Sequence, residues 1–185
     1  MPEQRVSVWS LPLRLTHWLV AIGVLAAWWT RHSPGSIHEW LGYAVWALVT
    51  LRLVGGVTGR GHTRFDDFVV SPVRTWNYAR AAVSGQAPRY LGHNPLGGWM
   101  ALVLWALIVA VCVTGWMYTT DRWWGIEWVE NLHEALTNIL LACVLFHVVG
   151  VIFTSRHQRE NLMAAMIHGR KRPAGTEPPA HGRRN

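Results

Sequence analysis

Four histidines lie in or at the edge of long apolar stretches of the sequence: His17, His38, His133 and His147. Ionisable side chains in such stretches are rare in membrane proteins and usually carry function. For any one of them alone, a hydrogen bond to a neighbouring helix is the alternative reading. His133 and His147 are 14 residues apart, which on one α-helix places them about 21 Å apart and within about 40° of the same face. One helix can therefore present an imidazole near each surface of a membrane.

Four apolar stretches are long enough to position these histidines across a hydrocarbon core of about 30 Å, which takes about 20 helical residues. They cover approximately residues 13–29, 38–57, 98–118 and 132–153. The chain is 51% hydrophobic and holds 13 tryptophans in 185 residues, and tryptophan concentrates where lipid meets water. We therefore expect an all-α integral membrane four-helix bundle over residues 1–170. The basic, proline-containing segment 171–185 is predicted to be a disordered cytoplasmic tail.

The formal net charge of +7 resides mainly in the segments between and after the apolar stretches. This is the distribution of a membrane protein rather than of a nucleic-acid-binding domain. Arginine and lysine concentrate before the first stretch, between the second and third, and after the fourth, so the positive-inside rule predicts cytoplasmic termini. Between the second and third stretches, Ser71, Pro72 and Gly85 delimit a predicted short interfacial helix on the cytoplasmic side.

The depths of the four histidines predict two pairs, because the helices alternate in direction. His17 and His147 fall on the inner side, and His38 and His133 fall on the outer side. Each pair can fill both axial positions of a haem iron, which leaves no vacant site and favours electron transfer. Zinc is the competing chemistry, but it requires about four ligands at one site. The sequence has no C-x-x-C-H motif, so any haem is held without covalent attachment.

Other residues are candidates for haem contacts. Small residues give a flat macrocycle room between helices, and Gly42, Gly115 and Gly150 are candidates for this role, with ordinary helix packing as the alternative. Arg52 lies 14 residues after His38, at the depth expected for the propionates of the inner haem, where its guanidinium can bind carboxylates. A plain positive-inside anchor is the alternative for Arg52. His93, in the segment before the third stretch, could border a quinone or a propionate, but it is expected to be solvated.

Several short segments resemble the bacterial cytochrome b561 family and the related b-type subunits of nickel-iron hydrogenases and formate dehydrogenases. They are Arg14-Leu15-Thr16-His17-Trp18, Leu41 after His38-Glu39, the run from Gly92 to Gly98, and His133-Glu134 followed by His147. The resemblance implies a four-helix bundle in the bacterial inner membrane. It also implies two haem b groups bound by His17, His38, His133 and His147, and electron exchange with membrane quinone.

The resemblance implies one of several roles. Some members of this family exchange electrons with a dehydrogenase or hydrogenase, some with a soluble cytochrome, and some oxidise superoxide. The two predicted outer loops and their flanks hold Arg31 and Arg122 against five carboxylates, which favours a basic partner such as a c-type cytochrome over an anionic substrate. We therefore expect an electron carrier or quinone-linked oxidoreductase subunit that serves a redox partner at the periplasmic face. A superoxide oxidase that reduces quinone is one alternative. A transporter or assembly protein with intramembrane histidines is another.

Overall fold

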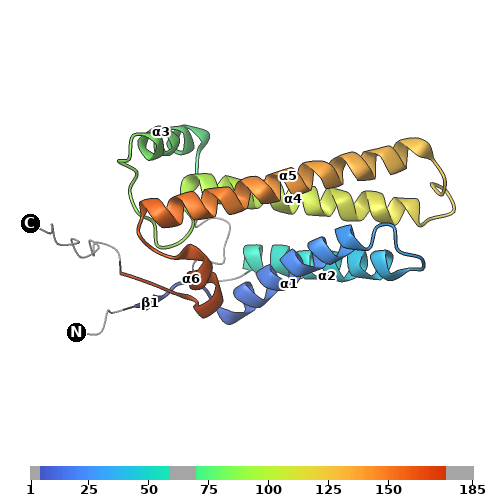
Figure 1. Cartoon of the computed structure of the whole chain (residues 1–185), viewed down its shortest axis with the longest axis horizontal. Coiled ribbons are helices and arrows are strands. Elements are labelled where there is room, and N and C mark those ends of the chain that lie inside the picture. The colour runs from blue at the N-terminus through green and yellow to red at the C-terminus, as the bar shows by residue number, and fades with distance from the viewer. Residues whose placement is uncertain (1–4, 59–69, 174–185) are drawn as a thin grey trace, which may run out of the picture.

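The computed structural model describes residues 5–58 and 70–173 (Figure 1). Four long helices, α1 (Leu11–Trp29), α2 (Ile37–Thr58), α4 (Pro95–Tyr118) and α5 (Glu127–His157), run back and forth along one axis. Two shorter helices, α3 (Pro72–Val83) and α6 (Leu162–His168), lie near one end, together with strands β1 (Val6–Ser7) and β2 (Arg170–Lys171). The predicted all-α bundle is confirmed. The fourth predicted stretch, 132–153, is shorter than the observed α5, which continues at both ends.

Local sequence explains where the helices begin and end. Before α4, the Asn94 side chain accepts a hydrogen bond of 2.7 Å from the backbone N–H of Gly97, and Pro95 occupies the first helical position, where its missing N–H costs nothing. In α5 the first turn carries Glu127 and Glu130, and the last turn carries Arg156 and His157. The charges of Glu127, Glu130 and Arg156 interact favourably with the helix dipole at the two ends. They explain why α5 extends into polar sequence beyond the apolar stretch.

The four long helices expose apolar side chains on their outer faces. Each is long and apolar enough to cross a membrane. In α5, for example, Leu145, Phe146 and Phe153 are all well exposed. A helix that is apolar around its whole circumference and still exposes that surface is suited to lipid rather than to water. The chain is therefore a multi-pass membrane protein.

The bundle is built from two helical hairpins. Helix α1 packs along α2, α4 packs along α5, and α2 joins the hairpins through α4, whereas α5 approaches α1 and α2 less closely. The buried core at mid-height consists of Val20, Val45, Val49, Ile108 and Leu140. Leu140 lies seven residues from His133 and seven from His147. The packed core therefore separates two regions along α5, one toward each end of the bundle.

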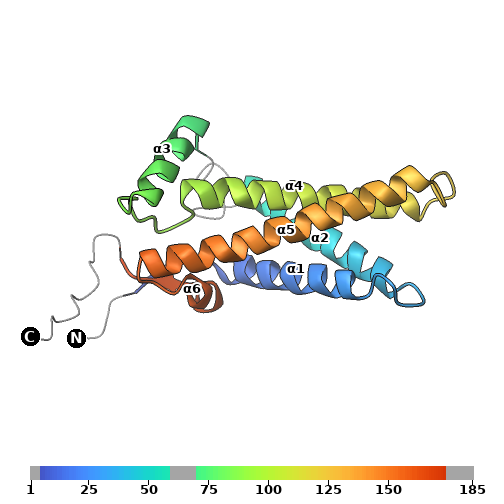
Figure 2. The ribbon, with the colours of Figure 1, turned by 45° about the horizontal axis from the view of Figure 1, so that its top comes forward.

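The described ends of the chain meet at one end of the bundle, here called the terminal end. Strands β1 and β2 pair in antiparallel fashion, and the backbone N–H groups of Val8 and Trp9 both donate to the carbonyl of Gly169 at 2.8 and 3.1 Å. The indole of Trp18 in α1 donates to Met166 in α6 at 3.3 Å, and α6 lies beside the start of α1 in Figure 2. Nothing in the sequence pattern indicated this pairing. We call the opposite end, with the short connections 30–36 and 119–126, the loop end.

One boundary from the sequence analysis is corrected. Lys171 was assigned to a disordered tail, but it belongs to β2 and is only 5% exposed, and Arg172 is 9% exposed. Pairing with β1 and hydrogen bonds to the turn after α5 order this stretch as far as Pro173. Residues 174–185 lie outside the described residues. The predicted interfacial helix agrees closely with α3, which Ser71 caps by accepting a hydrogen bond of 3.4 Å from the N–H of Arg74.

Candidate functional site

The two predicted histidine pairs occupy opposite ends of the bundle. At the loop end, α2 supplies His38 near its start and α5 supplies His133 near its start. At the terminal end, α1 supplies His17 and α5 supplies His147. Helix α5 thus contributes one histidine to each pair, and the 14-residue spacing of His133 and His147 sets the distance between the two pairs.

The imidazole rings of His38 and His133 lie close to each other. Their ring centres are 6.2 Å apart and their planes are nearly perpendicular, at 87°. A metal–imidazole nitrogen bond is about 2 Å long and the ring centre lies about 1 Å beyond the nitrogen, so two axial imidazoles on one iron place their ring centres about 6 Å apart. The observed separation therefore fits the two axial ligands of a haem iron.

Hydrogen bonds orient both of these imidazoles. Nδ1 of His38 lies 2.8 Å from the carbonyl oxygen of Ala27. Nδ1 of His133 lies 3.1 Å from the carbonyl oxygen of Val111 and 3.1 Å from Oγ1 of Thr114. Because a carbonyl oxygen only accepts, Nδ1 must carry the proton in both rings. The proton-free nitrogen is then Nε2, which is the arrangement that second-shell bonds impose on metal-binding histidines.

The terminal-end pair is arranged differently. His17 and His147 are near enough to interact electrostatically, and the indole of Trp18 meets the His17 ring edge-on, with centres 5.2 Å apart. Within the described residues, Nδ1 of His17 is buried without a hydrogen-bond partner. The terminal-end pair thus lacks, at His17, the carbonyl bond that both loop-end histidines have.

The three candidate glycines differ in their surroundings. A Cβ atom on Gly115 would lie 3.0 Å from Cε1 of His133, so this glycine makes room for the imidazole itself. A Cβ atom on Gly42 or Gly150 would meet no atom within 4 Å. Gly42 and Gly150 lie about one helical turn after His38 and His147. The open space beside them is compatible with a flat macrocycle next to each ligand.

Basic and aromatic side chains surround the terminal-end pair. His93 is half-buried with its Nδ1 atom out of contact with solvent, and its ring centre lies 4.9 Å from that of Trp9. Burial, together with the nearby Lys171 and Arg52, lowers the pKa of His93 to about 4, with smaller contributions from the terminal-end histidines. The expectation that His93 is solvated is therefore wrong. The guanidinium of Arg52 lies 5.8 Å from the ring centre of Trp105, and it interacts electrostatically with His93.

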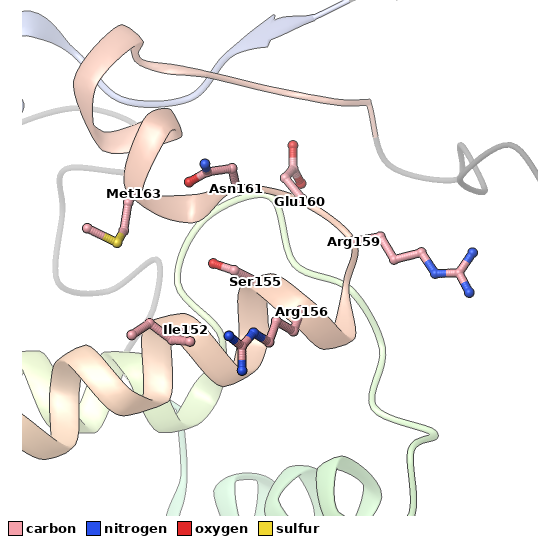
Figure 3. A pocket seen from close by; sticks show the side chains of 7 residues that line it. All are labelled: Ile152, Ser155, Arg156, Arg159, Glu160, Asn161 and Met163. Atoms are coloured by element: carbon pink, nitrogen blue, oxygen red, sulfur yellow. The ribbon is translucent and has the colours of Figure 1, made fainter. Parts of the chain in front are cut away.

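An open groove of about 290 Å³ lies where α5 turns into α6 (Figure 3). It contains none of the four histidines, and Arg159 points away from the other side chains that line it. Within the described residues, no group of three or more His, Cys, Asp or Glu side chains gathers where it could hold a metal ion. The lining residues of the groove are Ile152, Ser155, Arg156, Arg159, Glu160, Asn161 and Met163.

A membrane helical bundle with paired histidines between its helices is typical of membrane b-type cytochromes. The chain belongs to the prokaryotic cytochrome b561 family, whose family model matches residues 8–169. It is also similar to a probable Ni/Fe-hydrogenase B-type cytochrome subunit of Rhizobium leguminosarum bv. viciae, with 22% identity over 214 residues, covering 91% of this chain and 90% of that protein. No solved structure matches the chain. The protein is thus a transmembrane cytochrome b that binds haem and takes part in electron transport.

Proposed function

We propose that the chain carries two haem b groups and passes electrons between membrane quinone and a redox partner at the outer face. His17 and His147 bind the inner haem, and His38 and His133 bind the outer haem. The observation that carries the proposal is the 6.2 Å separation of the His38 and His133 rings. When bound, haem would supply one-electron chemistry, and two histidines that held its iron would leave no open position for a substrate.

The surrounding residues hold these ligands in place. The carbonyls of Ala27 and Val111 fix the tautomer and orientation of the outer imidazoles, which reduces the reorganisation needed at each electron transfer. Gly42 and Gly150 leave room for the macrocycles, and Arg52 is assigned to the propionates of the inner haem. Buried apolar side chains at mid-height exclude water between the two sites.

The terminal end is proposed to face the cytoplasm of a bacterium, with the chain in the inner membrane. Helix α3 and the segments around α6 carry exposed arginines at this end, among them Arg74, Arg80 and Arg170. Cytoplasmic segments of membrane proteins are enriched in such residues. Fusion of a reporter to each end of the chain tests this orientation, because a reporter that folds only in the periplasm should remain inactive at both termini.

The loop end then faces the periplasm and is acidic. Asp121, Glu127, Glu130 and Glu134 are exposed there, and Glu39 is half-buried. The guanidinium of Arg31 lies 4.4 Å from the ring centre of Trp28, and that of Arg122 lies 5.1 Å from the ring centre of Trp123. This face suits a basic partner, such as a c-type cytochrome, better than an anion such as superoxide. The Rhizobium relative is named as a hydrogenase subunit, so a hydrogenase or dehydrogenase is the other candidate partner.

Haem stoichiometry tests the two-haem proposal. A pyridine haemochrome assay on purified protein should find two haems per chain, His147→Ala should lose the inner haem, and His38→Ala should lose the outer haem. His157→Ala is the matched control, because His157 lies in the last turn of α5 and stacks on Phe153 instead of facing another histidine. One haem per chain in the unmodified protein, or loss of both haems from a folded single variant, would overturn the proposed pairs.

Electron transfer to the partner is tested separately. Stopped-flow mixing of the reduced protein with a basic c-type cytochrome should give a rate that falls steeply with ionic strength. Glu127→Gln with Glu130→Gln should slow the reaction at low salt. A rate that is insensitive to both salt and these substitutions would exclude this class of partner, and rapid quinone-dependent reduction by superoxide would favour the superoxide oxidase instead.

A further inference from the structure

The connection between α4 and α5, residues 119–126, presents an exposed tryptophan at the loop end. The Trp124 side chain is 69% exposed. Its backbone N–H donates to the carbonyl of Thr120 at 2.9 Å, and further backbone hydrogen bonds join the connection to the first turn of α5. Gly125 has φ of 71°, a conformation that glycine adopts without strain. The indole is thus held on a hydrogen-bonded turn, so little ordering is needed when a partner binds it.

This connection, here called the Trp124 turn, projects from the bundle. In both views it reaches further along the bundle axis than the connection between α1 and α2 (Figure 1, Figure 2). Glu127, which follows the turn, is 13 residues before Leu140 of the mid-height core, or about 20 Å along α5. The hydrocarbon core of a bilayer extends about 15 Å from its centre. With the mid-height core at that centre, the Trp124 turn lies outside the hydrocarbon, where a soluble protein can reach it.

The Trp124 turn also lies close to the loop-end histidine pair. The ring centre of Trp124 is 5.5 Å from that of Tyr118, whose hydroxyl donates to the Glu130 carboxylate at 3.2 Å. Tyr118 follows Gly115 by three residues, and Gly115 is the glycine that makes room for His133. Glu130 precedes His133 by three residues. Tyr118 and Glu130 are thus about one helical turn further toward the loop end than this ligand, and a short distance favours electron transfer because its rate falls steeply with distance.

The charge around the Trp124 turn is negative. Residues 119–131 carry one guanidinium and three carboxylates, all exposed: Arg122, Asp121, Glu127 and Glu130. The guanidinium of Arg122 lies 5.1 Å from the ring centre of Trp123. Protein interfaces commonly place aromatic anchors at their centre and charged groups at their rim. An exposed indole among three carboxylates therefore complements a protein whose apolar patch is surrounded by cations.

We propose that Trp124 anchors a docking site for a basic redox protein, with Tyr118 packed against it and the three carboxylates at the rim. This inference rests on the proposed function, because the partner exchanges one electron with the outer haem. Burial of the indole supplies affinity that salt does not screen. The rim carboxylates steer the encounter, and salt screens them. The alternative for an exposed tryptophan is an anchor to lipid headgroups, which predicts no effect on protein binding.

Binding to the haem-loaded protein in nanodiscs tests the site, with Trp29→Ala as the matched control for Trp124→Ala. Trp29 is 79% exposed at the same end, but it ends α1 beside Trp28, which the guanidinium of Arg31 approaches to 4.4 Å. Surface plasmon resonance with a basic c-type cytochrome measures association and dissociation separately. Trp124→Ala should weaken binding about thirtyfold, the loss typical of an interface hot spot, mainly through faster dissociation. Trp29→Ala should change it by less than about twofold.

The rim and the anchor should respond differently to salt. Asp121→Asn with Glu127→Gln, which leaves the Tyr118–Glu130 hydrogen bond in place, should slow association at low salt and change dissociation little. The loss in Trp124→Ala should be similar at low and high salt. Trp124→Phe should bind with intermediate affinity, because a smaller ring still packs on Tyr118.

Equal binding by Trp124→Ala and Trp29→Ala would overturn the docking site and assign Trp124 to the lipid. The pyridine haemochrome assay shows whether each variant retains its haems. If Trp124→Ala does not, Trp124→Phe is compared with Trp29→Phe: weaker binding by Trp124→Phe supports the site, and equal binding contradicts it. Failure of the proposed function differs from all of these outcomes, because the unmodified protein would then hold fewer than two haems or bind the basic cytochrome without salt dependence.

Discussion

Replacing Gly115 by alanine should weaken the outer haem without harming the fold. The new Cβ atom would lie 3.0 Å from Cε1 and 3.5 Å from Nδ1 of His133. The imidazole can yield only by straining its hydrogen bond to Val111. Overpacking of this kind costs about 1–3 kcal/mol, so outer-haem affinity should fall between about fivefold and a hundredfold, given about 1.4 kcal/mol per factor of ten. Within a helix the same change favours folding by about 0.5–1 kcal/mol.

Titration of haem into haem-depleted Gly115→Ala protein, followed by the pyridine haemochrome assay, measures this effect. The inner haem should bind with unchanged affinity, because His17 and His147 lie at the other end of the bundle. Gly55→Ala is the control, since Gly55 is also helical and a Cβ atom there meets nothing within 4 Å. If Gly115→Ala binds both haems as the unmodified protein does, with unchanged spectra, Gly115 does not limit the position of His133 and the reasoning is wrong.

Three further predictions concern the loop-end ligands and the terminal end. The 87° between the ring planes of His38 and His133 predicts a strongly anisotropic low-spin EPR signal for the outer haem, whereas a weakly anisotropic signal would show parallel rings. Gly169→Ala should destabilise the terminal end by about 1–2 kcal/mol or more, because Gly169 has φ of 82° and a Cβ atom would lie 2.7 Å from the carbonyl oxygen of Trp9. Faster proteolysis near β1 and β2 would reveal this destabilisation, and unchanged proteolysis would refute it. Although burial favours its protonated form, hydrogen bonds from Arg172 and Arg89 hold the pKa of Glu160 below its usual 4.5. Its stabilising contribution should therefore be complete above that pH and lost as pH falls through the lower folded value, and Glu160→Gln should remove this part of the pH dependence of thermal unfolding.

Hydrophobic length and charge placement were sufficient to predict the bundle. Four apolar stretches became four helices because the backbone in a membrane must satisfy its hydrogen bonds internally. Helix ends were harder to predict, since capping by charge extended α5 beyond its apolar part. The pairing of β1 with β2 could not be predicted, because two-residue strands of polar sequence carry no periodicity. Lys171 was misassigned for the same reason: its burial comes from tertiary contacts with Trp9 and Gly92.

The histidines of the candidate site were recognisable, but their supporting groups were not. Spacing along α5 and alternating helix direction were enough to predict two histidine pairs. In the structure His38 lies close to His133, and His17 interacts electrostatically with His147. The acceptors of the outer imidazoles include the carbonyls of Ala27 and Val111, and a backbone carbonyl has no residue signature. Thr114 could have been noticed, because a hydroxyl 19 residues before His133 is buried in an otherwise apolar helix. The contact of His93 with Trp9 could not be predicted either, because it arises only when the loop before α4 folds inward.

The two ends of the bundle differ in ways that predict the direction in which the haem potentials increase. A hydrogen bond from Nδ1 to a carbonyl makes an imidazole a stronger electron-pair donor to iron, which favours the oxidised state. Both loop-end histidines have such a bond. Nδ1 of His17 has no such bond within the described residues. Nearby charge acts in the same direction, because carboxylates surround the loop end whereas Lys171 and Arg52 lie at the terminal end.

The terminal-end haem should therefore have the higher midpoint potential. Electrons that enter at the loop end should then move across the membrane to the terminal-end haem, toward the higher potential. Redox titration of the unmodified protein, with His147→Ala protein used to assign the outer haem, measures the order directly. Thr114→Val, which removes one acceptor from His133, should raise the outer potential toward the inner one. If the outer haem instead has the higher potential, imidazole hydrogen bonding and local charge do not dominate the difference, and the favourable direction of transfer is from the terminal end to the loop end.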